Sequence, residues 1–309
     1  MYSYTIIQWL FFFYLYCFLG WCVESTYVSI KDRKLTNRGF LRGPFLPLYG
    51  SGATMMLVVS MPFRDNVLLV YVAGCIGATV LEYVTGVTME ALFKVRYWDY
   101  SKNKFNFQGH ICLGTSLSWG FLTISLTEVI HVPVERLVLP IPGQALTIVT
   151  LVLTVWIVAD FALSFRAAID LRDLLVKMGR AKEELVQIQK RLDSIITSAG
   201  ESIGSRKDAI AVSMEELKAG IESMLEHLKD MTLSKPSAYL ESVKEELLEL
   251  KTKYAINVEL GSRLSSIRDF FQRNLLRGNP TMTSEEYGDE LEELKQKAGR
   301  KKDEQSAVK

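Results

Sequence analysis

The chain has 309 residues, a formal net charge of +1 and 23% charged residues, a length that suits about two domains. A net charge this close to zero gives no reason to expect a nucleic-acid partner. The charges are unevenly spread, because the sequence before Phe165 is mostly apolar and aromatic whereas Glu, Lys, Leu and Ser dominate after it.

Five stretches of the first half approach the length of about 20 apolar residues that a transmembrane helix needs. They are residues 4–30, 48–62, 67–93, 111–130 and 144–165, of which the second is short. The first has no basic residue before it and no small-residue cleavage site after it, so we expect an anchor rather than a cleaved signal peptide. The predicted fold is all-α, a polytopic helical membrane bundle of about five transmembrane helices over residues 1–165.

Basic residues in the short loops predict the orientation of such a bundle, because Lys and Arg favour the cytoplasmic side. The loops after the first and third stretches are the basic ones, with Lys31, Arg33, Lys34, Arg38 and Arg42 in one and Lys94, Arg96, Lys102 and Lys104 in the other. The remaining two loops each hold a single Arg beside an acidic residue. An odd number of crossings then places the N-terminus outside and the C-terminus in the cytoplasm.

The region of residues 166–297 carries apolar residues at alternating spacings of three and four, the pattern of a coiled coil. No helix breaker separates it from the fifth stretch, which predicts one continuous helix that leaves the membrane. Ser234 and Pro236 indicate a helix start after a turn, so an antiparallel hairpin and a dimeric coiled coil both remain open. Residues 298–309 are expected to be disordered. We interpret this tail as a packing and spacing module that supports a homo-oligomer or a hetero-complex.

Charged side chains within apolar stretches are costly and usually face a bundle interior or a cavity. Glu24, Glu82, Glu90 and Asp160 are such residues. Three of them lie toward the predicted cytoplasmic ends, where neutralising a nearby Arg is as good an explanation as a functional role. Glu82 lies deeper, which favours function.

The first basic loop cannot form a regular helix, because glycines and prolines interrupt it. Its candidate residues are Asn37 and Arg38 for function, and Gly39, Gly43, Pro44, Pro47 and Gly50 for the backbone shape. A re-entrant or broken entry to the second span is one interpretation, since such breaks often line substrate paths. An ordinary loop is the other.

The second basic loop places Arg96 close to Trp98 and Asp99, which predicts an ordered cluster at the level of the lipid headgroups. Gly109 is a further candidate for shaping the backbone. His110 is a lone imidazole at the edge of a span, for which we favour a hydrogen-bonded role over a metal ligand.

The sequence indicates neither a cofactor nor a metal site. Cys17, Cys22, Cys75 and Cys112 all fall in apolar stretches without metal-ligand spacing. The chain also lacks the Gly-x-x-x-x-Gly-Lys-Ser/Thr loop that binds nucleotide phosphates. We therefore assign no catalytic residue.

Several motifs carry a resemblance to a known family. They are residues 21–24, 37–50, 82–83, 89–101 and 106–120. In their order and spacing the sequence resembles the bacterial membrane-protein family named Putative ABC-transporter type IV, over about residues 4–165. The resemblance implies a permease-like membrane component in a bacterial plasma membrane, and the heptad-rich tail is additional to the family pattern.

Three functions from different classes fit these features. The first, which we predict, is a membrane component of a transport system, with a separate ATPase and with a dimer or a partner subunit to complete a pore. The second is a membrane-anchored scaffold or sensor that recruits partners through its coiled coil. The third is an intramembrane or lipid-modifying enzyme, with acid–base groups and a phosphate clamp among Glu82, Glu90, Arg96, Asp99 and His110. The substrate stays open.

Overall fold

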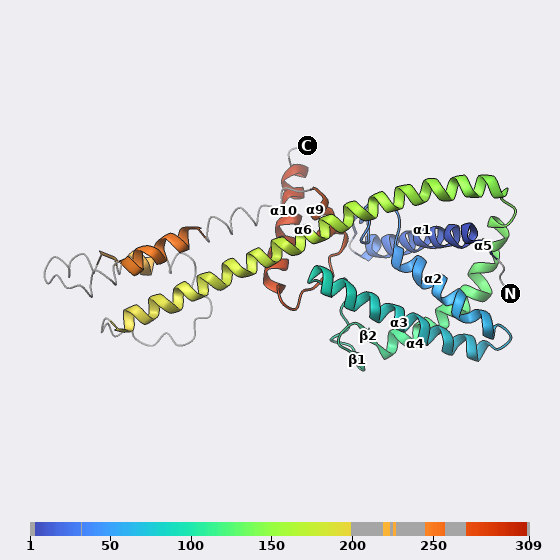
Figure 1. Ribbon diagram of the computed structural model, residues 1–309, viewed down its shortest axis with the longest axis horizontal. Coiled ribbons are helices and arrows are strands. Elements are labelled where there is room, and N and C mark those ends of the chain that lie inside the picture. The colour runs from blue at the N-terminus through green and yellow to red at the C-terminus, as the bar shows by residue number, and fades with distance from the viewer. Residues whose placement is uncertain are drawn as a thin grey trace. The chain divides into compact units, whose positions relative to one another are not determined.

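The computed structural model describes residues 4–31, 33–198, 219–222, 225–226, 245–256 and 270–307. The chain divides into two compact units (Figure 1). We call Met1–Asp173 with Ile267–Lys309 the membrane unit, and Leu174–Ser266 the tail unit. Each is described by itself.

Helices form almost all of the regular structure in the described residues, so the predicted all-α fold is confirmed (Figure 1). The helices are α1 (Ile6–Lys31), α2 (Pro47–Ser60), the 3-10 helix η1 (Met61–Phe63), α3 (Val67–Phe93), α4 (Leu113–Ile124), the π-helix η2 (Ser125–Ile130), α5 (His131–Val138), α6 (Gly143–Ser198), α9 (Phe270–Gly278) and α10 (Gly288–Ala307). The strands β1 (Asn106–Phe107) and β2 (Ile111–Cys112) pair as a small antiparallel hairpin.

Within the described residues, 4 helical segments are long and apolar enough to cross a membrane: Ile6–Lys31, Val67–Phe93, Leu113–Val138 and Gly143–Arg191. Large apolar side chains along these segments are exposed rather than buried, for example Ile76 on α3 and Val155 on α6. Water disfavours an apolar surface of this extent. Lipid is the solvent that fits these helices, so the chain is a polytopic membrane protein.

The difference from the predicted five spanning helices lies in the second pass. α2 has 14 residues, so it is about 21 Å long, whereas the hydrocarbon core of a bilayer is roughly 30 Å thick. A bent, non-helical segment precedes α2 and reaches the middle of α1, where the Leu46 N–H donates to the Cys17 carbonyl at 2.9 Å. The second pass therefore begins with irregular backbone that leads into a short helix. Its placement as a re-entrant or broken entry within the bilayer stays a prediction.

The fourth predicted span extends further than residues 111–130. One helical segment continues from Leu113 to Val138 through α4, η2 and α5. Within it the Thr127 hydroxyl donates to the Thr123 carbonyl at 2.9 Å. Such side-chain bonds compete with the helical ladder, and Thr127 lies in the segment where that ladder is widened to a π-helix. The sequence places the end at Ile130 because His131 follows it, whereas the helix continues through His131 to Val138.

The helices of the membrane unit pack in chain order, α1 on α2, α2 on α3 and α3 on α4. Two glycines set the closest approaches. A Cβ at Gly20 would lie 2.4 Å from Cβ of Tyr49, and one at Gly74 would lie 2.1 Å from Oγ1 of Thr123. Lipid gives no hydrophobic driving force for helices to associate, so they depend on van der Waals packing. Residues without a large side chain allow the close backbone approach that this packing needs.

In the tail unit, α6 continues without a break to Ser198, which is the continuous helix that the sequence predicts. Ion pairs link its described segments, Arg191 with Glu246 and Lys251 with Glu222. Most of the later heptad repeat and the predicted turn lie outside the described residues. The coiled coil and its pairing therefore stay predictions.

The C-terminal residues belong to the membrane unit, a placement that the sequence does not predict (Figure 1). An antiparallel bridge pairs Thr283 with Arg96, with N–H to carbonyl distances of 2.7 and 2.9 Å. The Ser284 hydroxyl donates to the Lys94 carbonyl at 2.6 Å. We call residues 278–286 the C-terminal strap. The helix predicted to begin near Ser284 begins at Gly288, and it continues to Ala307, into the region for which the sequence predicts disorder.

Candidate functional site

Asp160 on α6 holds the turn of residues 37–46, which we call the first inward loop. Its carboxylate accepts the backbone N–H of Gly43 at 2.7 Å and that of Arg42 at 3.3 Å. The Phe45 N–H donates to the Gly43 carbonyl at 2.8 Å, which makes a γ-turn around Pro44. The loop can lie against apolar helices because Asp160 satisfies backbone groups that lipid cannot.

Asn37 and Gly39 shape the start of the first inward loop. The Asn37 side chain accepts from the Trp21 indole at 2.6 Å and donates to the Arg42 carbonyl at 2.5 Å. Gly39 has a φ of 128°, which residues with a side chain rarely adopt. The predicted backbone-shaping role of Gly39 thus has a physical reason.

Pro47 and Gly50 shape the entry into α2. Pro47 is the first residue of that helix, where its missing N–H costs no hydrogen bond. A Cβ at Gly50 would lie 2.4 Å from Sγ of Cys17. The start of α2 is thereby pressed against the middle of α1.

Glu24 on α1 joins the first inward loop to the C-terminal strap through an arginine. Its carboxylate accepts from the Arg38 Nε at 3.4 Å and from the Tyr49 hydroxyl at 2.7 Å. The Arg38 guanidinium also donates to the Gly278 carbonyl at 3.1 Å and to the Thr281 hydroxyl at 3.2 Å. Glu24 therefore has the arginine partner that the sequence offers as one explanation for it.

Glu90 near the end of α3 has a matching arrangement. It accepts from the Arg96 Nε at 2.6 Å, and its other oxygen lies 3.1 Å from Nε2 of His110. Arg96 reaches on to Glu285 of the strap at 2.6 Å, with Asp99 4.0 Å away. Burial acts to lower the pKa of Arg96, but these carboxylates outweigh it and raise the pKa, so the guanidinium stays charged.

Residues 97–112 form a second inward loop, which lies along α3. The Trp98 indole donates to the His110 carbonyl at 3.0 Å, and Gly109 has a φ of 71°. Asp99 accepts from the Ser101 N–H at 2.9 Å and from its hydroxyl at 2.5 Å. Burial acts to raise the pKa of Asp99, but the Ser101 hydrogen bonds and nearby positive charges outweigh it and lower the pKa. These bonds give the loop a defined conformation, and its predicted place at the level of the lipid headgroups stays a prediction.

Glu82 is the deepest of the predicted carboxylates and is only 5% exposed. It accepts from the Tyr100 hydroxyl at 3.0 Å and from the Trp119 indole at 2.9 Å. Burial, together with the Glu82 charge, raises the pKa of Tyr100, so this hydroxyl stays protonated and keeps donating. Neutral donors hold Glu82, and no ion pair to it is present among the described residues.

Glu24 and Glu82 are each held by a tyrosine hydroxyl. Tyr49 donates to Glu24, and Tyr100 donates to Glu82. Glu24 is partly exposed and paired with Arg38, whereas Glu82 is buried. We call Glu82, Tyr100 and Trp119 the interior polar cluster. It can accept or hold a proton or a polar solute, because its carboxylate lies inside an apolar bundle.

Sequence reasoning selects Glu82 as a candidate but misses Tyr100 and Trp119 as its hydrogen-bond partners. Aromatic residues in membrane proteins usually face lipid or headgroups, so their hydrogen bonds to a carboxylate carry no separate signal. Both residues lie within the motifs that carry the family resemblance, which is the signal that was available.

A second buried polar group, also missed, surrounds His131 where α5 begins. The Tyr4 hydroxyl lies 3.0 Å from its Nε2, and the Tyr16 hydroxyl lies 2.7 Å from its Nδ1. Tyr4 also donates to Glu135 at 2.5 Å. In the described residues no group of three or more His, Cys, Asp or Glu side chains is arranged to hold a metal ion.

Long lipid-facing helices, two inward loops and buried carboxylates between them define a polytopic helical membrane protein with a polar interior. The family model described as Putative ABC-transporter type IV matches residues 11–165. The chain belongs to this family, and it is a membrane protein of a transport-related family. No curated protein and no solved structure matches the chain.

Proposed function

We propose that this protein is the permease-like membrane component of a transport system whose ATPase is a separate chain. The observation that carries the proposal is the interior polar cluster, in which Glu82 is buried between helices and held only by neutral donors. Buried carboxylates of this kind mark solute or proton paths in membrane bundles. The family is compatible with an ATPase partner.

The proposed topology has the N-terminus outside and the C-terminus in the cytoplasm of a bacterial plasma membrane. Arg38 and Arg96 come from separate basic loops, and both contact the same C-terminal strap. Both loops therefore lie at one end of the membrane unit. The excess of Lys and Arg in them supports a cytoplasmic location for that end.

Co-purification tests the partnership. The tagged full-length protein is extracted in mild detergent, and the bound proteins are identified by mass spectrometry. We expect a stoichiometric ATPase. Recovery of cytosolic proteins without an ATPase, all lost when residues 174–266 are deleted, would replace the transport proposal with the scaffold or sensor.

Glu82→Gln tests the interior polar cluster in that complex. Gln keeps the size of the side chain but removes its charge, so we expect the ATPase to stay bound and its activity in lipid nanodiscs to fall severalfold. Glu128→Gln is the matched control, because Glu128 is an exposed carboxylate in another spanning segment. Equal effects of the two variants would argue against a special role for Glu82.

A further inference from the structure

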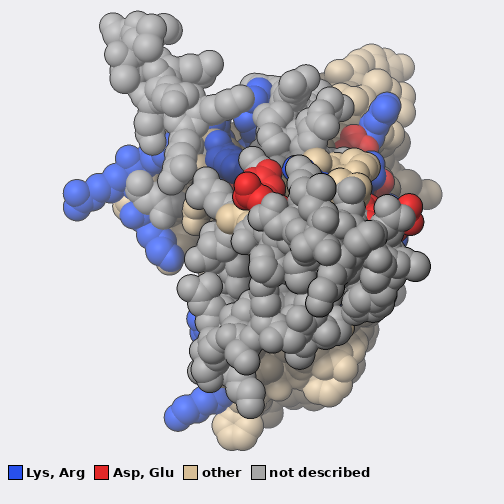
Figure 2. Space-filling view, turned by 90° about the vertical axis from the view of Figure 1, so that its left-hand side faces the viewer, with Lys and Arg blue, Asp and Glu red and all other residues tan. Residues whose placement is uncertain are grey.

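His131, where α5 begins, is a buried titratable group that the proposed function does not use. Lys, Arg, Asp and Glu side chains lie on the described surface seen in Figure 2, where water can solvate them. The His131 side chain is instead enclosed, with 0% of its surface exposed. The rings of Phe12 and Tyr4 pack against it edge to face, at centroid distances of 5.1 and 5.8 Å. What its two nitrogens bond to therefore decides its state.

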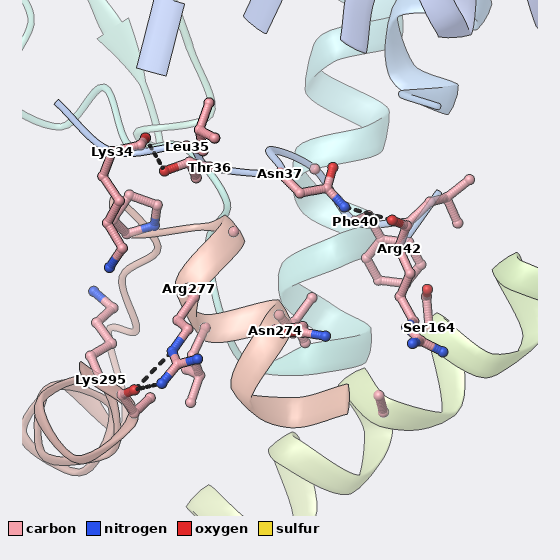
Figure 3. A pocket seen from close by; sticks show the side chains of 18 of the residues that line it. Lys34, Leu35, Thr36, Asn37, Phe40, Arg42, Ser164, Asn274, Arg277 and Lys295 are labelled. Atoms are coloured by element: carbon pink, nitrogen blue, oxygen red, sulfur yellow. Dashed lines mark hydrogen bonds between the residues drawn. The ribbon is translucent and has the colours of Figure 1, made fainter. Parts of the chain in front are cut away.

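The cavity between the first inward loop, α6 and α9 shows a different situation (Figure 3). Asn37 donates to the Arg42 carbonyl at 2.5 Å, and Arg277 donates to the Ala298 carbonyl at 2.6 Å. These polar groups bond to backbone carbonyls, which do not titrate. The partners of His131 are titratable side chains.

The bonds of His131 indicate which ring nitrogen carries the hydrogen. The Tyr4 hydroxyl has one hydrogen, which it donates to the Glu135 carboxylate at 2.5 Å. Its contact with Nε2 of His131 at 3.0 Å therefore needs an N–H on Nε2. Nδ1 of the neutral ring is then an acceptor, and the Tyr16 hydroxyl donates to it at 2.7 Å. We call Tyr16, His131, Tyr4 and Glu135 the histidine chain.

The histidine chain leads from the surface of the membrane unit into its interior. Tyr4 and Glu135 are partly exposed, whereas Tyr16 is only 5% exposed. Tyr4 precedes α1 and the first inward loop follows α1. The histidine chain therefore lies at the end of the membrane unit opposite that loop.

The surroundings of His131 act on a positive charge of its ring in opposite directions. Burial disfavours the charge, the Glu135 carboxylate favours it, and Arg64 disfavours it. Tyr4 and Tyr16 can accept a hydrogen bond from a charged ring as well as exchange one with a neutral ring. The site can thus hold either state of the imidazole.

We propose that His131 is a proton-binding site, and that the bound proton reverses its hydrogen bond with Tyr16. One proton from water adds to the ring, which then has an N–H on both nitrogens and a single positive charge. Nδ1 now donates to the Tyr16 oxygen, so the Tyr16 hydrogen turns to another acceptor. Tyr4 keeps donating to Glu135, whose carboxylate compensates the charge.

Tyr16 connects this switch to the interior polar cluster. It belongs to a buried apolar cluster that includes Leu57 of α2, and Trp119 packs against the same cluster. Trp119 is also a donor to Glu82. A change at Tyr16 should therefore alter the surroundings of Trp119. The inference goes beyond the proposed function, because binding of this proton needs neither an ATPase nor a transported solute.

Nuclear magnetic resonance of the full-length protein in detergent micelles, with nitrogen-15 in its histidines, measures the ring directly. The chain has 3 histidines, and His110→Gln and His227→Gln identify the other signals. Near neutral pH we expect a hydrogen on Nε2 of His131 and none on Nδ1. On acidification Nδ1 should gain one while the protein stays folded. A hydrogen on Nδ1 alone near neutral pH, or no second hydrogen before unfolding, would overturn the proposal.

Tyr16→Phe removes the acceptor for the charged ring. Hydrogen bonds of charged groups are stronger than those of neutral ones, so the pH of half-protonation of His131 should fall by about half a unit or more. Tyr14→Phe is the matched control on α1, because the Tyr14 hydroxyl donates to Thr154 instead. Equal shifts in the two variants would contradict the role of Tyr16.

Glu135→Gln removes the compensating carboxylate and should also lower the pH of half-protonation. Glu128→Gln is its control, because Glu128 is an exposed carboxylate in the same spanning segment. It should leave the titration of His131 unchanged. An unchanged titration in Glu135→Gln would contradict the compensation of charge.

The nitrogen-15 indole signal of Trp119, identified with Trp119→Phe, tests the connection to the interior polar cluster. In the wild-type protein it should shift with the same midpoint as His131, and His131→Asn should abolish the shift. If the His131→Asn protein does not fold, Tyr16→Phe replaces it, and the Trp119 midpoint should move together with that of His131. A Trp119 signal that does not follow His131 would overturn the switch.

Discussion

Arg38 and Arg96 are the residues through which the membrane helices contact the C-terminal strap. Each donates to a carboxylate on an apolar helix, Glu24 or Glu90, and each also donates to the strap. The fork of a guanidinium allows this double contact, because its several N–H groups point in fixed directions. Removing one arginine therefore affects a helix and the strap together.

Arg96→Gln should lower the stability of the protein by about 2 kcal/mol or more, since Arg96 is mostly buried and its loss leaves Glu90 without its cation. The measurement is the midpoint of thermal unfolding in detergent. Adding Glu90→Gln should recover part of the loss. Arg172→Gln, at a more exposed arginine that pairs with its neighbour Asp173 and donates a long hydrogen bond to the Leu92 carbonyl, should cost less than about 1 kcal/mol. Equal losses for the two arginine variants would contradict the assignment.

Gly74→Ala tests the close contact of α3 with α4. The added Cβ would meet the Thr123 side chain at 2.1 Å, so the helices must move apart, at a cost of about 1–3 kcal/mol. Gly52→Ala in α2 is the control, because a Cβ there meets no atom within 4 Å and alanine favours a helix. Thermal unfolding should show a decrease for the first variant and no decrease for the second.

At the scale of the element, the first inward loop is a bent, non-helical segment that leads into the short helix α2. Such a backbone leaves N–H groups that lipid cannot satisfy. Asp160, on a neighbouring helix, accepts two of them. An acidic residue in an apolar helix is thus explained by the loop that packs beside it.

Asp160→Asn should loosen the first inward loop, because an amide offers one accepting oxygen where the carboxylate offers two. We expect faster hydrogen exchange at the backbone N–H of Gly43 and a stability loss of about 1–3 kcal/mol. Asp173→Asn is the control on the same helix, since Asp173 pairs with Arg172 alone in the described contacts. Unchanged exchange at Gly43 would show that the loop is held by other contacts.

At the scale of the whole molecule, the membrane unit combines two segments of the chain, Met1–Asp173 and Ile267–Lys309. The strap binds both basic loops, through Arg38 and Gly39 in one and Lys94 and Arg96 in the other. The positive charges of Lys94 and Arg96 are therefore partly neutralised by acidic residues of the strap, which lie far along the chain. The strap also joins α9 to α10 along the chain.

Deletion of residues 270–309 should increase hydrogen exchange at the Arg96 N–H, which loses the Thr283 carbonyl as its acceptor. Deletion of residues 299–309 should not, because the whole strap and Ala298, which accepts from Arg277, are retained. Exchange measured by mass spectrometry on peptides that cover residues 94–97 distinguishes the two. Equal protection in both truncated proteins would contradict the docking of the strap.

The sequence by itself determined the elements whose cause is local. Runs of apolar residues require lipid or a core, so the spanning helices followed from composition, and the glycines and prolines of residues 37–50 excluded a regular helix in the second pass. Glu82 stood out because a charge in such a run needs a reason. The length of the fourth span was less well determined, since a buried His131 looks polar in sequence.

Only the tertiary structure decided which side chains meet. Trp119 reaches Glu82 from another helix, and the Arg38 side chain contacts Gly278, 240 positions away. A hydrogen bond needs a direction and a distance of about 3 Å, and neither can be derived from a single sequence when the partners belong to different elements. The carboxylates could be predicted from their cost in lipid, but their partners and the position of the strap depend on how distant parts of the chain fold against each other.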